Sequence, residues 1–84
     1  MWAVIWWNKA LDELADAMAR SDLSTQDLIE QIVKRFTSEL ARDPLQLGES
    51  RTGNRRIAFD APCAITFLVE SGNRVVKVTH FWTY

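Results

Sequence analysis

The amino-acid sequence predicts an α+β fold in which a helical hairpin packs on one face of a mainly antiparallel sheet. Three observations predict it. The chain starts with an aromatic, β-branched segment, continues with two segments of helical period, and ends with three segments of strand pattern. The expected order of elements is therefore β-α-α-β-β-β. If both helices cover one sheet face, the opposite face stays open to ligands or partners.

The first strand is expected at residues 2–7, which are too few for a helix and rich in aromatic and β-branched side chains. Asn8 is then expected to cap the following helix, because its side-chain oxygen can accept a hydrogen bond from a first-turn amide. Helical spacing predicts one apolar face on that helix, made of Leu11, Leu14, Ala15 and Met18.

A second helix is expected to start at Ser24 or Thr25, with Asp27 as a capping-box-like partner of Ser24. Pro44 cannot continue a helix and disfavours helical geometry at the residue before it, so the helix should end near Arg42. The apolar stripe of this helix is predicted at Leu28, Ile29, Ile32, Val33, Phe36 and Leu40.

Three strands are expected in the second half of the chain, at residues 56–59, 64–70 and 74–84. The middle strand is almost continuously apolar, which predicts a central position in the sheet. The turn at residues 71–73 is expected to use Gly72 for a positive φ. The predicted fold brings Leu14, Phe36 and Phe59 together in the core. Strict alternation on the last strand assigns one face to Val76, Val78, His80, Trp82 and Tyr84.

The composition predicts a single domain over residues 1–84, since a hydrophobic content of 48% argues against disorder. One cysteine cannot form an internal disulfide, which suits a reducing compartment such as the cytoplasm. No metal-binding motif, bilayer-spanning apolar run or signal peptide is recognisable, so neither a membrane nor a metal partner is expected. The net charge of −1 divides unevenly: residues 1–44 hold five basic and eight acidic side chains, and residues 45–84 hold five basic and three acidic ones.

The strongest functional signal is a cluster of three arginines, Arg51, Arg55 and Arg56, on a polar loop that leads into a strand. Arginine binds phosphate with two hydrogen bonds and stabilises the charge that develops in phosphoryl transfer. The alternative is an ordinary solvated loop edge. Because neighbouring strand residues point to opposite faces, at most one of Arg55 and Arg56 is expected to reach a given site.

His80 and Tyr84 are expected on one strand face, about 13 Å apart along the backbone. Histidine transfers protons near neutral pH, and tyrosine stacks on bases. With the arginines, these side chains have the chemistry for metal-free RNA cleavage, in which a 2′-hydroxyl attacks the adjacent phosphate. The alternative is that His80 is an ordinary strand residue and Tyr84 an amphipathic end of the core. The catalytic set predicted for cleavage is Glu49, as a base, with Arg56, His80 and Tyr84; the predicted phosphate-binding set is Arg51, Arg55 and Lys77.

Residues 43–59 contain the pattern D-P-L-x-x-G-E-S-R-x-G-x-R-R-x-x-F, followed by F-x-V at 67–69 and a last strand with an aromatic ending. These features resemble the toxins of the RelE/ParE superfamily, often labelled plasmid stabilisation proteins. The first half of the chain is similar to that family in the order and length of its elements. The resemblance therefore extends over nearly the whole chain.

The resemblance implies the toxin of a type II toxin–antitoxin pair, with a cognate antitoxin as partner and no cofactor. RelE-like members are endoribonucleases that cut mRNA, usually in the ribosome, with basic, His and Tyr side chains on the open sheet face. On this chain, Arg55 or Arg56, His80 and Tyr84 fit those positions. ParE-like members share the fold and inhibit DNA gyrase instead. RelE-like ribonucleases are usually strongly basic, and this chain is not, so a non-catalytic protein-binding member is a third alternative.

Overall fold

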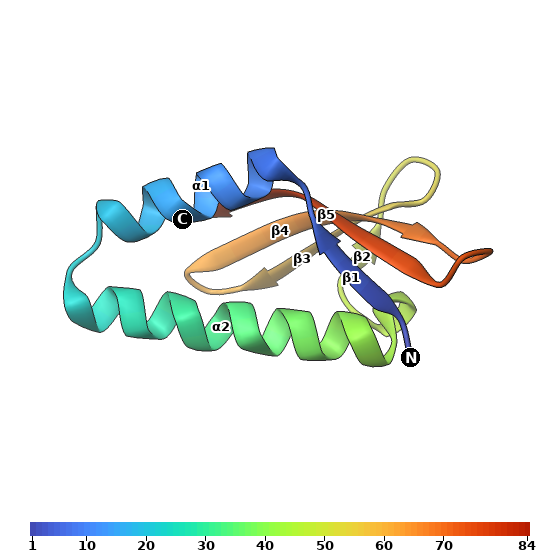
Figure 1. Cartoon of the computed structure of the whole chain (residues 1–84), viewed down its shortest axis with the longest axis horizontal. Coiled ribbons are helices and arrows are strands. Elements are labelled where there is room, and N and C mark those ends of the chain that lie inside the picture. The colour runs from blue at the N-terminus through green and yellow to red at the C-terminus, as the bar shows by residue number, and fades with distance from the viewer.

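The computed structural model describes all residues from 1 to 84 and has two α-helices packed on a mixed five-stranded sheet (Figure 1). The predicted α+β class and the helical hairpin are therefore confirmed. The elements are β1 (Ala3–Trp6), α1 (Asn8–Ala19), α2 (Leu23–Arg42), the 3-10 turn η1 (Pro44–Gln46), β2 (Glu49–Ser50), β3 (Arg55–Asp60), β4 (Cys63–Glu70) and β5 (Val75–Thr83).

The strands lie in the order β1-β5-β4-β3-β2, so β4 is the central strand, as its apolar sequence predicts. β1 pairs in parallel with β5, whereas the other neighbours are antiparallel. The sequence pattern did not indicate the two-residue strand β2. The parallel pairing follows from the topology, because both helices separate β1 from the rest of the sheet and return the chain to its far edge.

The core lies between one face of the sheet and the two helices. Every second residue of β4 points into it, and β3 and β5 add smaller contributions. The sheet side chains of the core are Ala58, Cys63, Ile65, Phe67, Val69, Val76, Val78 and Phe81. The helix side chains that meet them are Ala10, Ala17, Ile29, Ile32, Phe36 and Leu40.

A β-bulge in β5 changes which side chains share a face. Thr66 pairs with His80, whereas the next residue, Phe67, pairs with Val78, so Thr79 is the extra residue. The Thr79 hydroxyl lies 2.8 Å from the Thr66 hydroxyl, which satisfies both groups. The prediction that His80 shares a face with Val76 and Val78 is therefore wrong. His80 and Trp82 point away from the helices, and Phe81 points into the core.

α1 packs through small residues. Its fully buried positions are Ala10 and Ala17, and Leu14 and Met18 pack against the edge of the core. Leu11 is instead 45% exposed, so the predicted apolar face was rotated from the observed one. The predicted cap is also wrong, because Trp7 is the N-cap residue, makes no side-chain cap bond, and leaves Asn8 as the first residue of the helix.

α2 starts at Leu23, one or two residues earlier than the sequence pattern predicts. The carboxylate of Asp22 accepts a 2.8 Å hydrogen bond from the Thr25 amide, so Asp22 is the cap in place of Ser24 or Thr25. The helix ends at Arg42, as predicted from Pro44. Its stripe is confirmed except at Leu28, which is exposed. Neither helix combines the length and the apolar character that crossing a bilayer requires.

Two details of the strand region differ from expectation. Phe59 is 56% exposed on the sheet face away from the helices, and the smaller Ala58 occupies the core position beside it. Packing of Phe59 with Leu14 and Phe36 is therefore not observed. In the β4–β5 turn, the residue with positive φ is Arg74, at 54°, in place of Gly72.

Candidate functional site

The sheet face away from the helices, here called the open face, presents its side chains in rows across the strands, and three of these rows carry the candidate site residues. Strand register defines the rows, which lie about 7 Å apart because residues of one face recur at every second position. The basic row is Ile5, Lys77, Leu68 and Arg55; the histidine row is His80, Thr66, Ile57 and Glu49; the aromatic row is Trp82, Ala64 and Phe59.

Arg55 and Lys77 are the cations of the basic row, and they differ in how they are held. The Lys77 Nζ lies 2.8 Å from the Glu70 carboxylate, and both side chains are about one-third exposed. Arg55 is exposed, and its guanidinium makes no hydrogen bond or ion pair within the chain. Arg55 is therefore the cation of this face that is ready to bind an anion.

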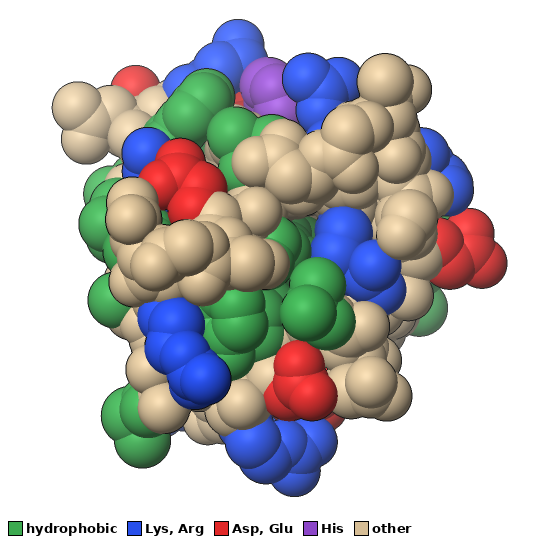
Figure 2. All heavy atoms as spheres, turned by 90° about the vertical axis from the view of Figure 1, so that its right-hand side faces the viewer, with side chains coloured by type: hydrophobic (Ala, Val, Ile, Leu, Met, Phe, Trp, Pro, Cys, Tyr) green, Lys and Arg blue, Asp and Glu red, His purple; other side chains and the backbone are tan.

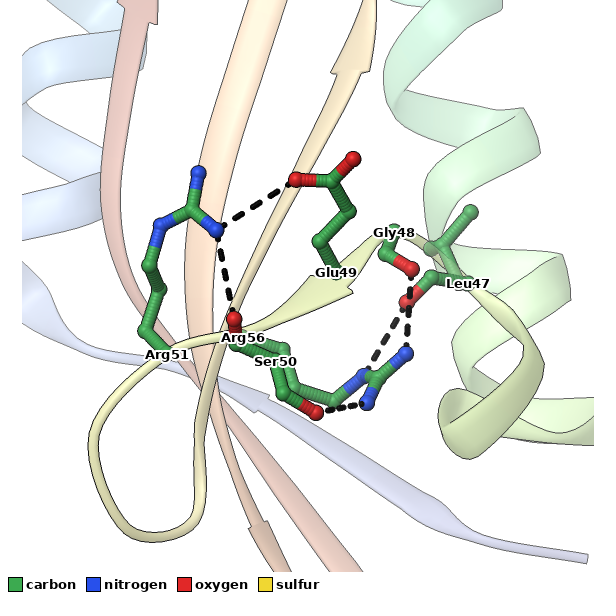
Figure 3. A network of polar contacts seen from close by, with 6 residues as sticks. All are labelled: Leu47, Gly48, Glu49, Ser50, Arg51 and Arg56. Carbon is green, nitrogen blue, oxygen red and sulfur yellow. Dashed lines mark hydrogen bonds and ion pairs between the residues drawn. The ribbon is translucent and has the colours of Figure 1, made fainter.

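Arg56 has a different role, because it lies on the opposite side of β3 and is held by the segment that precedes and forms β2 (Figure 3). Its Nε donates to the Leu47 carbonyl at 3.1 Å, Nη2 to the Gly48 carbonyl at 3.0 Å, and Nη1 to the Ser50 hydroxyl at 2.9 Å. This arrangement attaches residues 47–50 to β3. The structure therefore separates Arg56 from His80, although the sequence analysis placed both in one catalytic set.

The backbone of this loop permits only glycine at position 48. Gly48 has a φ of +68°, and a Cβ atom there would lie 2.1 Å from the Ile57 carbonyl oxygen. The close approach brings the Gly48 carbonyl within reach of Arg56. The loop and Arg56 thus form one structural unit.

Arg51 and Glu49 lie close together at the outer edge of the sheet (Figure 3). Arg51 Nη1 is 3.3 Å from the Glu49 carboxylate and 3.2 Å from the Ser50 carbonyl oxygen. Glu49 shares the histidine row with His80, but three strand spacings separate them, or about 14 Å between Cα atoms. The geometry thus does not bring Glu49 and His80 to one phosphate group.

His80 is held from the side of α1. β1 ends at Trp6, and beyond it α1 lies along the edge of β5, where the Glu13 carboxylate accepts a 3.2 Å hydrogen bond from the Phe81 amide (Figure 1). The same carboxylate oxygen lies 3.5 Å from His80 Nδ1. A carboxylate at one ring nitrogen orients an imidazole, and here Nε2 has no partner in the chain.

The rings of the aromatic row pack against each other and against Tyr84, which extends the row; Phe59 and Tyr84 are exposed, and Trp82 is half-buried. The rings of Phe59 and Trp82 have centroids 6.3 Å apart, and those of Phe59 and Tyr84 are 5.8 Å apart, both in edge-to-face geometry. Tyr84 therefore lies against Phe59 and makes no hydrogen bond with His80. The exposure of Phe59 is not predictable from the residue pattern, because the loop carbonyls that turn Arg56 toward the helix side of β3 leave no signal in the sequence.

Basic side chains outnumber acidic ones at one end of the molecule. Figure 2 shows the end that carries the β2–β3 loop and the β4–β5 turn, where Lys and Arg side chains are spread with fewer Asp and Glu between them. The +2 balance of residues 45–84 predicts such an asymmetry. No three side chains of His, Cys, Asp or Glu lie together in a group that could hold a metal ion.

Comparison with known proteins gives a result only at the level of structure. No protein-family model and no curated protein matches the sequence. A chain of the toxin–antitoxin complex RelBE2 from Mycobacterium tuberculosis superposes with a TM-score of 0.79, over 99% of this chain and 98% of that one, at 14% identity. The chain has the fold of the RelE toxins.

Two further structures agree with that result. A chain of the intact E. coli RelBE toxin–antitoxin complex covers 100% of this chain and 98% of its own length, at 15% identity and a TM-score of 0.69. The isolated E. coli RelE toxin covers 99% of this chain and 84% of its own length, at 13% identity and a TM-score of 0.68. The predicted resemblance to RelE/ParE toxins is thus confirmed for the RelE fold.

Proposed function

We propose that this protein is the toxin of a type II toxin–antitoxin pair and that it acts as an endoribonuclease on mRNA. The observation that carries the proposal is the open face, where Arg55, Lys77 and His80 occupy adjacent rows of the sheet beside a row of exposed aromatic rings. Cations that bind phosphate, a group that transfers protons and rings that stack on bases are the parts needed to bind and cut RNA. The RelE fold supports the same proposal.

In the proposed reaction, the 2′-oxygen of one nucleotide attacks the phosphorus atom that follows it, and its proton passes to solvent. The bond from phosphorus to the 5′-oxygen breaks, and His80 Nε2 donates a proton to that leaving oxygen. The products are a 2′,3′-cyclic phosphate and a free 5′-hydroxyl. Arg55 binds the reacting phosphate and stabilises its growing negative charge, and Lys77 binds a neighbouring phosphate. No metal or cofactor takes part in this scheme.

A protein partner is part of the proposal. Apolar side chains are exposed on β1 and both helices, among them Ile5, Leu11, Leu23 and Leu28. None of the four tryptophans is fully buried. Exposed apolar side chains of this kind offer contacts to a protein partner. We propose that a cognate antitoxin, encoded by the neighbouring gene, binds the toxin in the cytoplasm, and capture of that gene product by the tagged chain tests the pairing.

A second candidate is a non-catalytic family member that acts only by binding protein. The observation that favours it is that two of the three basic groups on the open face are paired within the chain, Lys77 with Glu70 and His80 with Glu13. RNA has to displace those carboxylates or bind beside them. Arg55, which has no such partner, is the reason for preferring the ribonuclease.

Growth after induction separates these candidates. Induction of the wild-type chain is expected to arrest growth, and co-expression of the neighbouring gene product is expected to restore it. His80→Ala and Arg55→Ala should relieve the arrest, because loss of a general acid typically costs about 10²–10⁴ in rate. Lys9→Ala, an exposed change on α1, is the control and should remain toxic. Full toxicity of His80→Ala would refute the proposed role of the histidine. Normal growth with the wild-type chain would favour the non-catalytic candidate.

A further inference from the structure

We propose that the aromatic row is a nucleobase-binding subsite in which Phe59 is the central stacking residue. This inference rests on the proposed function, since it assigns the position of an RNA base relative to the phosphate-binding groups. It adds a residue, Phe59, that the sequence analysis assigned to the core.

Phe59 is an apolar ring on the open face of the sheet, where no helix covers it. It is 56% exposed, and Tyr84 beside it is 63% exposed. The pairing partner of Phe59 on β4 is Ala64, which in turn pairs with Trp82 on β5. Phe59 and Trp82 therefore lie two strand spacings apart, or about 10 Å at the backbone. Their ring centroids are only 6.3 Å apart, so the rings lean toward each other over Ala64, which is fully buried.

The rings are held in defined orientations. Phe59 meets both Trp82 and Tyr84 edge to face, at interplanar angles of 89° and 86°. Tyr84 is also held by its amide, which donates to the Pro62 carbonyl at 2.9 Å. Rings that are already ordered lose little conformational entropy when a ligand stacks on them. The cluster is therefore suited to binding a flat aromatic group.

The charge on the same face favours a nucleic-acid base as that group. The aromatic row is followed along the strands by the histidine row and then by Arg55 and Lys77. Single-stranded nucleic acids are bound by this combination of stacking rings and cations along one groove. A chain lying along β4 would place a base on Phe59 while its phosphates reach His80 and Arg55.

The size of the patch argues against a protein segment as its main occupant. Aromatic side chains bury about 150–250 Å² each, so the exposed parts of these three rings sum to roughly 300 Å². A stable protein interface buries about 800 Å² on each partner. One or two bases fit an area of this size.

The test measures the affinity of purified protein for two oligonucleotides by fluorescence anisotropy. One is 2′-O-methyl hexauridylate, which cannot be cut because its 2′-oxygen is blocked, and the other is an abasic hexamer with the same backbone charge. The wild-type chain should bind hexauridylate about 5- to 150-fold more tightly, which corresponds to about 1–3 kcal/mol for a stacked base.

Phe59→Leu keeps an apolar side chain and removes the ring. It should lose the preference for hexauridylate and bind the abasic hexamer as the wild-type chain does. Phe59→Tyr should restore the preference. Ser38→Ala, at an exposed position on α2 that belongs to neither proposed site, should leave both affinities unchanged. Urea unfolding of each variant verifies that the fold is retained.

Three outcomes would overturn the inference: a Phe59→Leu variant that keeps the preference for hexauridylate, a wild-type chain without such a preference, or loss of antitoxin capture alone in Phe59→Leu. Cleavage of unmodified RNA is scored separately. Cleavage without base preference leaves the proposed function standing and removes the subsite. Base preference without cleavage supports the subsite and refutes the proposed ribonuclease function.

Discussion

Arg56→Ala is expected to destabilise the fold, whereas Arg55→Ala, one residue earlier, is expected to leave stability unchanged. Arg56 makes three hydrogen bonds that hold residues 47–50 against β3. Hydrogen bonds to charged groups contribute about 1.5–3 kcal/mol each when buried. Two of these three hydrogen bonds are exposed and the third is part-buried. In the variant, water can therefore bond to the acceptor groups that Arg56 leaves, which reduces the loss of stability. The net loss should be about 2 kcal/mol in the free energy of unfolding.

A loss of that size lowers the Tm of a domain of this length by roughly 8–16 °C, since each kcal/mol shifts it by about 4–8 °C. Arg55→Ala removes a side chain without a partner in the chain and should change the free energy of unfolding by no more than about 0.5 kcal/mol. Arg56→Lys is the intermediate case, because an ammonium group cannot direct three bonds in one plane.

Calorimetry of the three variants gives the stabilities, and growth after induction gives the activities. Arg55→Ala should be stable and non-toxic. A fully stable Arg56→Ala variant without toxicity would refute this division of roles and return Arg56 to the catalytic set.

Other predictions follow from single positions. Gly48→Ala should lower the free energy of unfolding in urea by more than about 3 kcal/mol, because the new Cβ meets the Ile57 carbonyl. Gly53→Ala has a similar φ of +66° but open space around it, so it should lower that free energy by only about 1 kcal/mol. Equal losses in the two variants would refute the clash at position 48. The hydrogen bond from the Thr25 amide lowers the pKa of Asp22 below its ordinary 3.8, so the stabilisation from this cap is present above pH 3.8 and is lost as the pH falls through the lowered value. In Asp22→Asn, the urea midpoint of unfolding should depend less on pH over that range. A pH dependence equal to that of the wild-type chain would contradict the cap. Burial raises the pKa of the Cys63 thiol, so alkylation should occur only as the protein unfolds, and rapid labelling of the native chain would contradict that burial.

The sequence predicts what depends on local pattern. The C-terminal end of the second helix, the central position of β4 and the approximate strand ranges follow from the spacing of apolar residues and from Pro44. Those features depend on neighbouring residues along the chain. The RelE-like order of elements follows from them as well.

The missed features depend on contacts between distant segments. Thr79 bulges because its hydroxyl bonds to Thr66 on the neighbouring strand, and that single extra residue moves His80 to the open face. Arg56 turns inward because the carbonyl groups of residues 47 and 48 lie there, which no periodicity reveals. Because Arg56 and Phe59 lie three positions apart on β3, they point to opposite faces, and with Arg56 on the helix side Phe59 lies on the open face. The register of β3 therefore fixes both the loop contacts of Arg56 and the aromatic row.

The bulge also decides how far the site was predictable. His80, Arg55 and Lys77 were all identified from residue type, and the structure brings them to one face. Tyr84 and Glu49 were identified by the same reasoning, and the structure places them at the far end of the aromatic row and at the opposite sheet edge. Residue type thus predicted the chemistry, and only the register of the sheet shows which side chains lie in adjacent rows.

Mapping transcript ends by primer extension after induction tests the central claim, that the open face cleaves mRNA, most directly. The account predicts new 5′ ends within mRNA soon after induction of the wild-type chain. Those ends should be absent with His80→Ala and with Arg55→Ala and should persist with Lys9→Ala. Intact transcripts in arrested cells, together with accumulated gyrase–DNA cleavage complexes, would contradict the account and identify a gyrase inhibitor instead.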